Sequence, residues 1–94
     1  MTVGLLTVDC FIPESLSLKD KRHVLRSISE RIRREFNVSI CEADYQDQWQ
    51  RTTLAVAVAN TEWPMARRTL HRIVEFLERE RRLNVLNTDI QQLY

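Results

Sequence analysis

The chain has 94 residues and a mass of 11.2 kDa, which is enough for one domain and too little for two separate cores. Its composition, 44% hydrophobic and 29% charged, is typical of a globular domain and unlike that of a disordered chain. The net charge of +1 indicates neither nucleic acid nor a membrane surface as a partner. The single glycine, Gly4, excludes phosphate-binding motifs that need two or more glycines. We therefore predict one domain over residues 1–94.

No apolar stretch approaches the roughly 18 residues of a membrane span, and the first residues lack the basic region and cleavage site of a signal peptide. These features predict a cytoplasmic protein with no membrane partner. Cys10 and Cys41 lie far apart in the sequence and have no C-x-x-C spacing. We expect both to be small buried thiols in a reducing compartment.

The first half of the chain predicts a strand, a helix and a second strand. Residues 2–12 are almost all apolar or β-branched and stop at Pro13, which is typical of a central strand. Ser17 and Asp20 have the spacing that caps the free amides of a helix start, and the helix is expected to run to about Phe36. Its apolar face carries Val24, Leu25, Ile28, Ile32 and Phe36. Residues 38–45 alternate and are partly acidic, which suits an edge strand.

The second half predicts a strand, a helix and a last strand. After a turn at 46–48, residues 51–60 form a β-prone run that is free of charge after Arg51, so a second central strand is expected. A helix begins within residues 61–64, because Pro64 is tolerated in a first turn. Its inner face carries Ala66, Leu70, Ile73 and Leu77. Residues 83–90 are polar and moderately β-prone and predict the final strand.

This order, β-α-β-β-α-β, predicts an α+β ferredoxin-like sandwich, with a four-stranded antiparallel sheet and two helices on one face. The other sheet face is then open. If the larger residues of 54–58 face the helices, the outward set is apolar and consists of Ala55, Ala57 and Ala59 with Val3, Leu5 and Phe11. An exposed surface of this kind marks an interface, so a homodimer or another protein partner on the open sheet face is one functional hypothesis.

Catalytic and metal-binding patterns are absent. The histidines, His23 and His71, lie on charged helix faces away from the apolar ones, and no cluster has metal-ligand spacing. Glu42, Asp44 and Asp47 have the oxygen ligands of a hard-cation site, but an acidic edge that prevents strand pairing accounts for them equally well. We expect no enzymatic activity, no metal, no cofactor and no small-molecule substrate.

The first helix is the most basic segment, with seven basic and three acidic residues between positions 17 and 37. Four of its cations fall within about 60° on a helical wheel, and the first turn itself favours anions. A solvated helix face and a phosphate-binding face both account for this pattern. No aromatic residue lies in 53–58, so the base-stacking platform of an RRM is absent. The candidate contacts to structured RNA or a ribosomal particle are Lys19, Lys21, Arg22, Arg26 and Arg33.

The predicted hairpin tip contains Gln48, Trp49, Gln50 and Arg51. Indole, amide and guanidinium groups together form a polar recognition tip in one interpretation. In the other, Trp49 folds back over the sheet edge and covers core residues. The general burial of large aromatic residues favours the second.

Three strings in the chain resemble a known family: Ser-Leu-Lys-Asp-Lys-Arg at 17–22, Phe-Asn-Val-Ser at 36–39 and Asp-Tyr-Gln-Asp-Gln-Trp-Gln-Arg at 44–51. They are similar to those of the YlxP-like bacterial proteins, a family of unknown function, over essentially the whole chain. Family members often have His at the position of Tyr45. The resemblance implies a ferredoxin-like fold and a gene neighbourhood shared with ribosome-maturation and translation-initiation factors, and it implies no catalytic residues.

Overall fold

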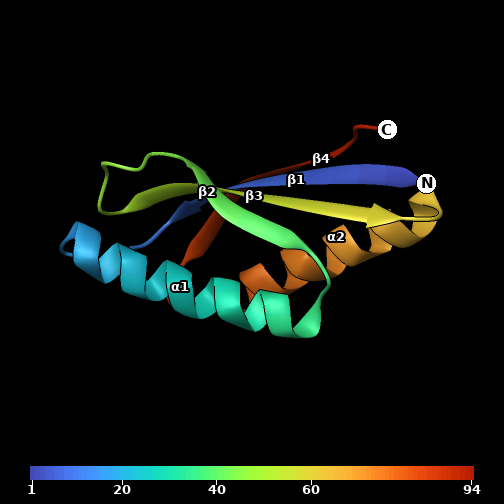
Figure 1. Ribbon diagram of the computed structural model, residues 1–94. Helices are drawn as coiled ribbons and strands as arrows, with labels where there is room; N and C mark the ends of the chain where they lie inside the picture. The colour runs from blue at the N-terminus through green and yellow to red at the C-terminus, as the bar shows by residue number, and fades with distance from the viewer.

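The computed structural model describes residues 1–94 and contains four strands and two helices (Figure 1). In chain order these are β1 (Thr2–Phe11), α1 (Leu18–Glu35), β2 (Ser39–Asp44), β3 (Arg51–Asn60), α2 (Trp63–Glu78) and β4 (Asn84–Gln92). The strands form one antiparallel sheet in the order β2-β3-β1-β4, and both helices cover the same face of it. This architecture confirms the predicted ferredoxin-like α+β sandwich.

The two central strands alternate between the core and the open face. In β3, Leu54 and Val56 are buried against the helices, whereas Ala55 and Ala57 are half-buried on the other side. The β1–β3 register then places Val3 opposite Ala59 and Leu5 opposite Ala57 on the open face, as predicted, whereas Phe11 lies opposite Arg51 and the same face also carries the polar residues Thr7, Asp9 and Thr53. The period of two along each strand accounts for this separation.

The helices begin where the sequence predicts. The Ser17 hydroxyl accepts a hydrogen bond from the Asp20 amide at 3.0 Å, and the Asp20 carboxylate accepts one from the Leu16 amide at 3.0 Å, so free N–H groups at this helix start have partners. In α2, Pro64 lies in the first turn, and the predicted inner face is fully buried: Ala66, Leu70, Ile73 and Leu77. Neither helix is long and apolar enough to cross a membrane.

The two cysteines differ, and the prediction that both are buried is wrong for Cys41. The register places Cys41 opposite Ala55, which points away from the helices, so its side chain is exposed on the edge strand. Cys10 lies in the core. Burial, with a smaller contribution from the charge of Asp9, raises the pKa of the Cys10 thiol to about 12 and keeps it protonated.

Gly4 of β1 lies directly under side chains of α2. A Cβ atom at this position would lie 2.9 Å from Cζ3 of Trp63 and 3.0 Å from Cδ1 of Leu70. Real Cβ atoms essentially never come closer than 3.0 Å to another heavy atom, so the contact with Trp63 would force a shift. The absence of a side chain therefore lets the first turns of α2 pack directly on β1.

Gly4→Ala is predicted to lower the free energy of unfolding by about 1 to 3 kcal/mol, the range for overpacking a filled core. Urea denaturation measures the change. A double-mutant cycle with Trp63→Leu provides the control, because a smaller side chain at 63 removes the closest clash and should reduce the cost of the added methyl group. An equal cost in both backgrounds would contradict this account of Gly4.

Candidate functional site

Lys21 is a buried lysine that joins the first helix to the β2–β3 connection. Its side chain is 1% exposed, and its Nζ donates to the backbone carbonyls of Tyr45 at 2.7 Å, Gln46 at 3.3 Å and Arg51 at 3.3 Å. The Glu42 carboxylate lies 3.0 Å from the same nitrogen. Four oxygen atoms thus replace the water that an exposed ammonium would bind.

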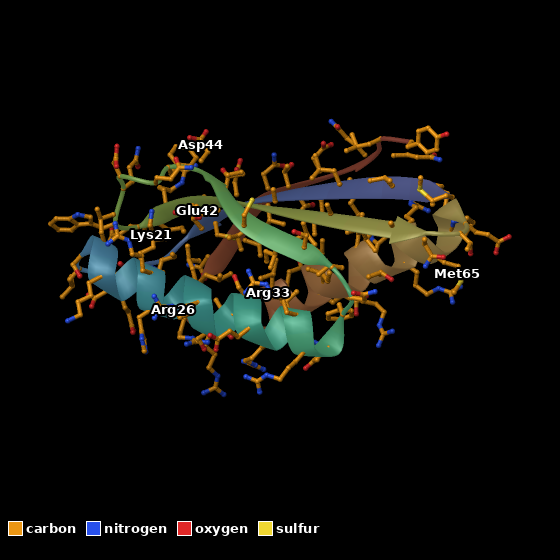
Figure 2. All side chains as sticks on the ribbon, viewed as in Figure 1. Lys21, Arg26, Arg33, Glu42, Asp44 and Met65 are labelled. Carbon is orange, nitrogen blue, oxygen red and sulfur yellow. The ribbon has the colours of Figure 1, made fainter.

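The carboxylate of Glu42 is also hydrogen-bonded to the neighbouring strand, β3. Its Oε2 accepts a hydrogen bond from the Thr52 hydroxyl at 2.6 Å and is the same oxygen that pairs with Lys21. Figure 2 shows Lys21 and Glu42 between α1 and β2. The β2–β3 register shifts between Glu42 and Asp44, directly before the connection begins. The bulge and the carboxylate together aim the end of β2 towards the ammonium.

Tyr45 has a backbone conformation that is unusual for a bulky residue. Its φ is 64°, in the left-handed region, and it is the only residue of the chain with a positive φ. The carbonyl of Tyr45 accepts from Lys21 and also from the Gln48 amide at 3.0 Å, and its own amide donates to the Asp44 carboxylate at 2.7 Å. The Arg51 guanidinium stacks on its ring at 4.6 Å. These contacts hold a conformation that costs about 1 to 3 kcal/mol elsewhere.

The connection is also tied to the loop that precedes α1. The Gln50 side-chain amide donates to the carbonyls of Pro13 at 3.0 Å and Ser15 at 3.2 Å. In the opposite direction, the Ile12 amide donates to the Gln50 carbonyl at 2.8 Å. The β2–β3 connection and the start of α1 therefore form one end of the molecule, as Figure 1 shows.

Trp49 projects from this end. Its side chain is 54% exposed and lies outside the hydrophobic core cluster, so the prediction that it folds back over the sheet edge is wrong. The residue that reaches back from this part of the connection is the neighbouring Gln50, whose side-chain amide donates to the carbonyls of Pro13 and Ser15. Of the predicted tip residues, Gln48 is exposed, whereas Gln50 and Arg51 are half-buried and make local contacts.

Three of the five predicted basic residues share one exposed surface. Lys19, Arg22 and Arg26 line a hollow of about 610 Å³ beside the first turns of α1. His23 and Arg82 complete its basic lining, and Glu14 and Asp20 are its two acidic residues. None of the three α1 cations takes part in an ion pair, since the ion pairs of the chain involve Lys21, Arg31 and Arg82. We refer to Lys19, Arg22 and Arg26 as the basic stripe.

The other two predicted cations are used within the fold. The Arg33 guanidinium donates to the Ile40 carbonyl at 3.1 Å and so joins α1 to β2. Lys21 is buried and does not belong with a surface that meets an external anion, which removes it from the predicted nucleic-acid contacts. Its spacing in the sequence indicates this burial, because Lys21 precedes Leu25 by four residues and Ile28 by seven and so lies on the apolar face of α1.

Arg82 reaches the hollow from the α2–β4 connection. Its Nε donates to the Glu80 carboxylate at 2.8 Å, and its terminal nitrogen donates to the Ser27 hydroxyl of α1 at 3.1 Å. The Arg82 hydrogen bond holds the pKa of Glu80 below its usual value, with further help from the charges of Arg82 and Arg31. This carboxylate therefore fixes Arg82 against α1 while remaining ionised. No group of three or more His, Cys, Asp or Glu side chains is arranged to hold a metal ion.

The fold and this end of the molecule define a small ferredoxin-like α+β domain with a lysine-anchored hairpin and an adjoining basic stripe. The model of a family described as "Protein of unknown function (DUF503)" matches residues 3–90. The chain is also 38% identical over 76 residues to the uncharacterized protein YlxP of Bacillus subtilis (strain 168), covering 81% of this chain and 83% of that protein. The chain belongs to the DUF503 family, which confirms the YlxP-like resemblance.

Lys21→Met is predicted to lower the free energy of unfolding by about 3 to 5 kcal/mol, because it leaves the Glu42 carboxylate and three carbonyls without their donor. Chemical denaturation measures the loss. Lys19→Met makes the same change two residues away on the exposed face and should cost no more than about 0.5 kcal/mol. Adding Glu42→Gln to Lys21→Met should recover part of the loss, and equal effects of the two lysine variants would contradict the assignment.

Proposed function

We propose that this protein is a non-enzymatic accessory protein that acts in the cytoplasm and contacts structured RNA through the basic stripe. The observation that carries the proposal is the convergence of Lys19, Arg22 and Arg26, all exposed and without ion-pair partners, on one hollow of about 610 Å³. Unpaired surface cations of this kind attract polyanions and release their counterions on binding.

The geometry of α1 supports contact with more than one phosphate. Lys19, Arg22 and Arg26 are separated by three and four residues, so their side chains lie on one face of the helix. Lys19 lies in the first turn of α1, where the helix dipole adds to its positive potential. Arg82 lies at the edge of the hollow, where its charge is paired with Glu80 and its terminal nitrogen donates to the Ser27 hydroxyl of α1. Glu14 and Asp20 are the acidic residues of this hollow, and the Asp20 carboxylate accepts a hydrogen bond from the Leu16 amide.

The proposed binding is dominated by phosphates and tolerant of sequence. Phosphate contacts set the position and orientation of a protein on a nucleic acid without reading its bases. Ribosomal RNA, free or in a ribosomal particle, is the ligand that the family resemblance suggests. The dependence on salt then becomes the signature of the interaction, since each neutralised phosphate contributes about 0.7 to 0.9 to the log-log slope.

The open sheet face supports a second candidate function, a homodimer or a complex with another protein. Val3 and Leu5 of β1 lie opposite Ala59 and Ala57 of β3 on the face that no helix covers. Apolar side chains that lie side by side on an uncovered sheet face are a feature of interaction sites. Sedimentation at micromolar concentration tests the homodimer, and Leu5→Glu should dissociate it if this face is the contact. A strict monomer counts against self-association.

Arg22→Gln with Arg26→Gln is predicted to reduce the log-log salt slope of binding to a ribosomal RNA fragment by about 1.4 to 1.8, the loss of two phosphate contacts. Fluorescence anisotropy over a series of salt concentrations measures the slope. Arg67→Gln with Arg68→Gln, two exposed arginines of α2, makes the same change in net charge and should leave the slope unchanged.

Two results would contradict the proposal. One is the absence of binding by the unmodified protein at low salt. The other is an equal loss of slope in both arginine pairs, which would indicate that total charge, and not the basic stripe, controls the interaction.

A further inference from the structure

The exposed indole of Trp49 lies outside the hydrophobic core cluster, on the β2–β3 connection, which is at the same end of the molecule as the start of α1 (Figure 1). It is 54% exposed, and with Phe11, Asp47, Gln48, Gln50 and Arg51 it borders a second, shallow hollow of about 420 Å³. Removing an aromatic ring from water is strongly favourable. A planar ligand that covers the exposed indole would therefore gain binding free energy from its burial.

The link between this hollow and the basic stripe is short. Gln50, the residue after Trp49, donates to the Pro13 and Ser15 carbonyls of the loop that leads into α1. Ser15 lines the basic hollow together with Lys19. One loop therefore separates the indole from the first cation of the stripe, and Figure 1 shows the β2–β3 connection and the start of α1 at the same end of the molecule.

The backbone of the hairpin tip is fixed by hydrogen bonds within the protein, in the absence of a ligand. Lys21 binds the carbonyls of Tyr45, Gln46 and Arg51, on either side of Trp49, and Gln50 is fixed to the loop. A side chain on a fixed backbone loses little conformational freedom when it binds, which favours affinity. Next to it, the half-buried Arg51 guanidinium is stacked on the Tyr45 ring at 4.6 Å and belongs to the fixed base of the tip.

We propose that Trp49 stacks on an unpaired base of an RNA whose phosphates lie along the basic stripe. The inference rests on the proposed function and adds the kind of RNA: a helix with an unpaired loop or end, in place of a continuous duplex. Unpaired bases stack on aromatic side chains and on arginine planes, whereas bases in a duplex are not available. The ligand therefore needs both a flat base and a neighbouring phosphate, the two chemistries that meet at this end.

The test compares an RNA stem-loop with a blunt duplex of the same stem sequence. Trp49→Ala is expected to weaken stem-loop binding by about 5- to 150-fold, the effect of losing one base–aromatic stack, and to leave duplex binding unchanged. Trp49→Phe should retain most of the stem-loop affinity because it keeps an aromatic face. Tyr94→Ala removes an exposed aromatic ring at the chain's C-terminus, away from the tip, and serves as the matched control with no expected effect.

A second measurement does not require a change in the tip. In a Trp63→Phe background the remaining tryptophan is Trp49, and its fluorescence should be quenched by the stem-loop and not by the duplex. Absence of quenching, or an equal loss of affinity for both RNAs in Trp49→Ala, overturns the stacking inference while leaving the basic-stripe proposal intact. Failure of the unmodified protein to bind either RNA at low salt overturns both.

Discussion

The buried ammonium of Lys21 is the interaction on which this end of the molecule depends. A charge taken out of water is costly unless it is paired and its hydrogen bonds are satisfied. Here the end of β2, the connection and the start of β3 provide the required oxygens, through Glu42, the carbonyls of Tyr45 and Gln46, and the carbonyl of Arg51. The left-handed Tyr45 and the bulge before it are tolerated because this cation fixes the carbonyls around them.

The first turns of α1 present cations on two different faces, one buried and one exposed. Lys21 points inward and holds the hairpin, whereas Lys19 and Arg22 point outward and border the basic hollow. A helix separates neighbouring residues by about 100°, so a run of cations in sequence divides between core and surface. In this arrangement the hairpin tip with Trp49 and the stripe of cations keep a fixed relation to each other, because one short segment of α1 positions both.

Sequence patterns predicted most of the fold because its determinants are local. Alternation in 51–60, the Ser17 cap and the inner face of α2 each follow from residue spacing alone. The site was predicted less well. The positive charge of Lys21 concealed its place on the apolar face of α1. The connection that carries Trp49 is held by hydrogen bonds from Gln50 to a loop some 35 residues away in sequence, which no local pattern predicts. The exposure of Cys41 follows from strand register, which a single edge strand does not specify.

Amide hydrogen exchange of the Lys21→Met variant tests most directly whether this ammonium holds the hairpin. The Ile12 amide, which donates to the Gln50 carbonyl at 2.8 Å, reports on the tip, and the Leu93 amide, which donates to the Val3 carbonyl at 2.8 Å, reports on the opposite end of β1. We predict that the Lys21→Met variant loses far more protection from exchange at the Ile12 amide than at the Leu93 amide, because the tip opens as a local unit. An equal change at both amides, or none at Ile12, would contradict it.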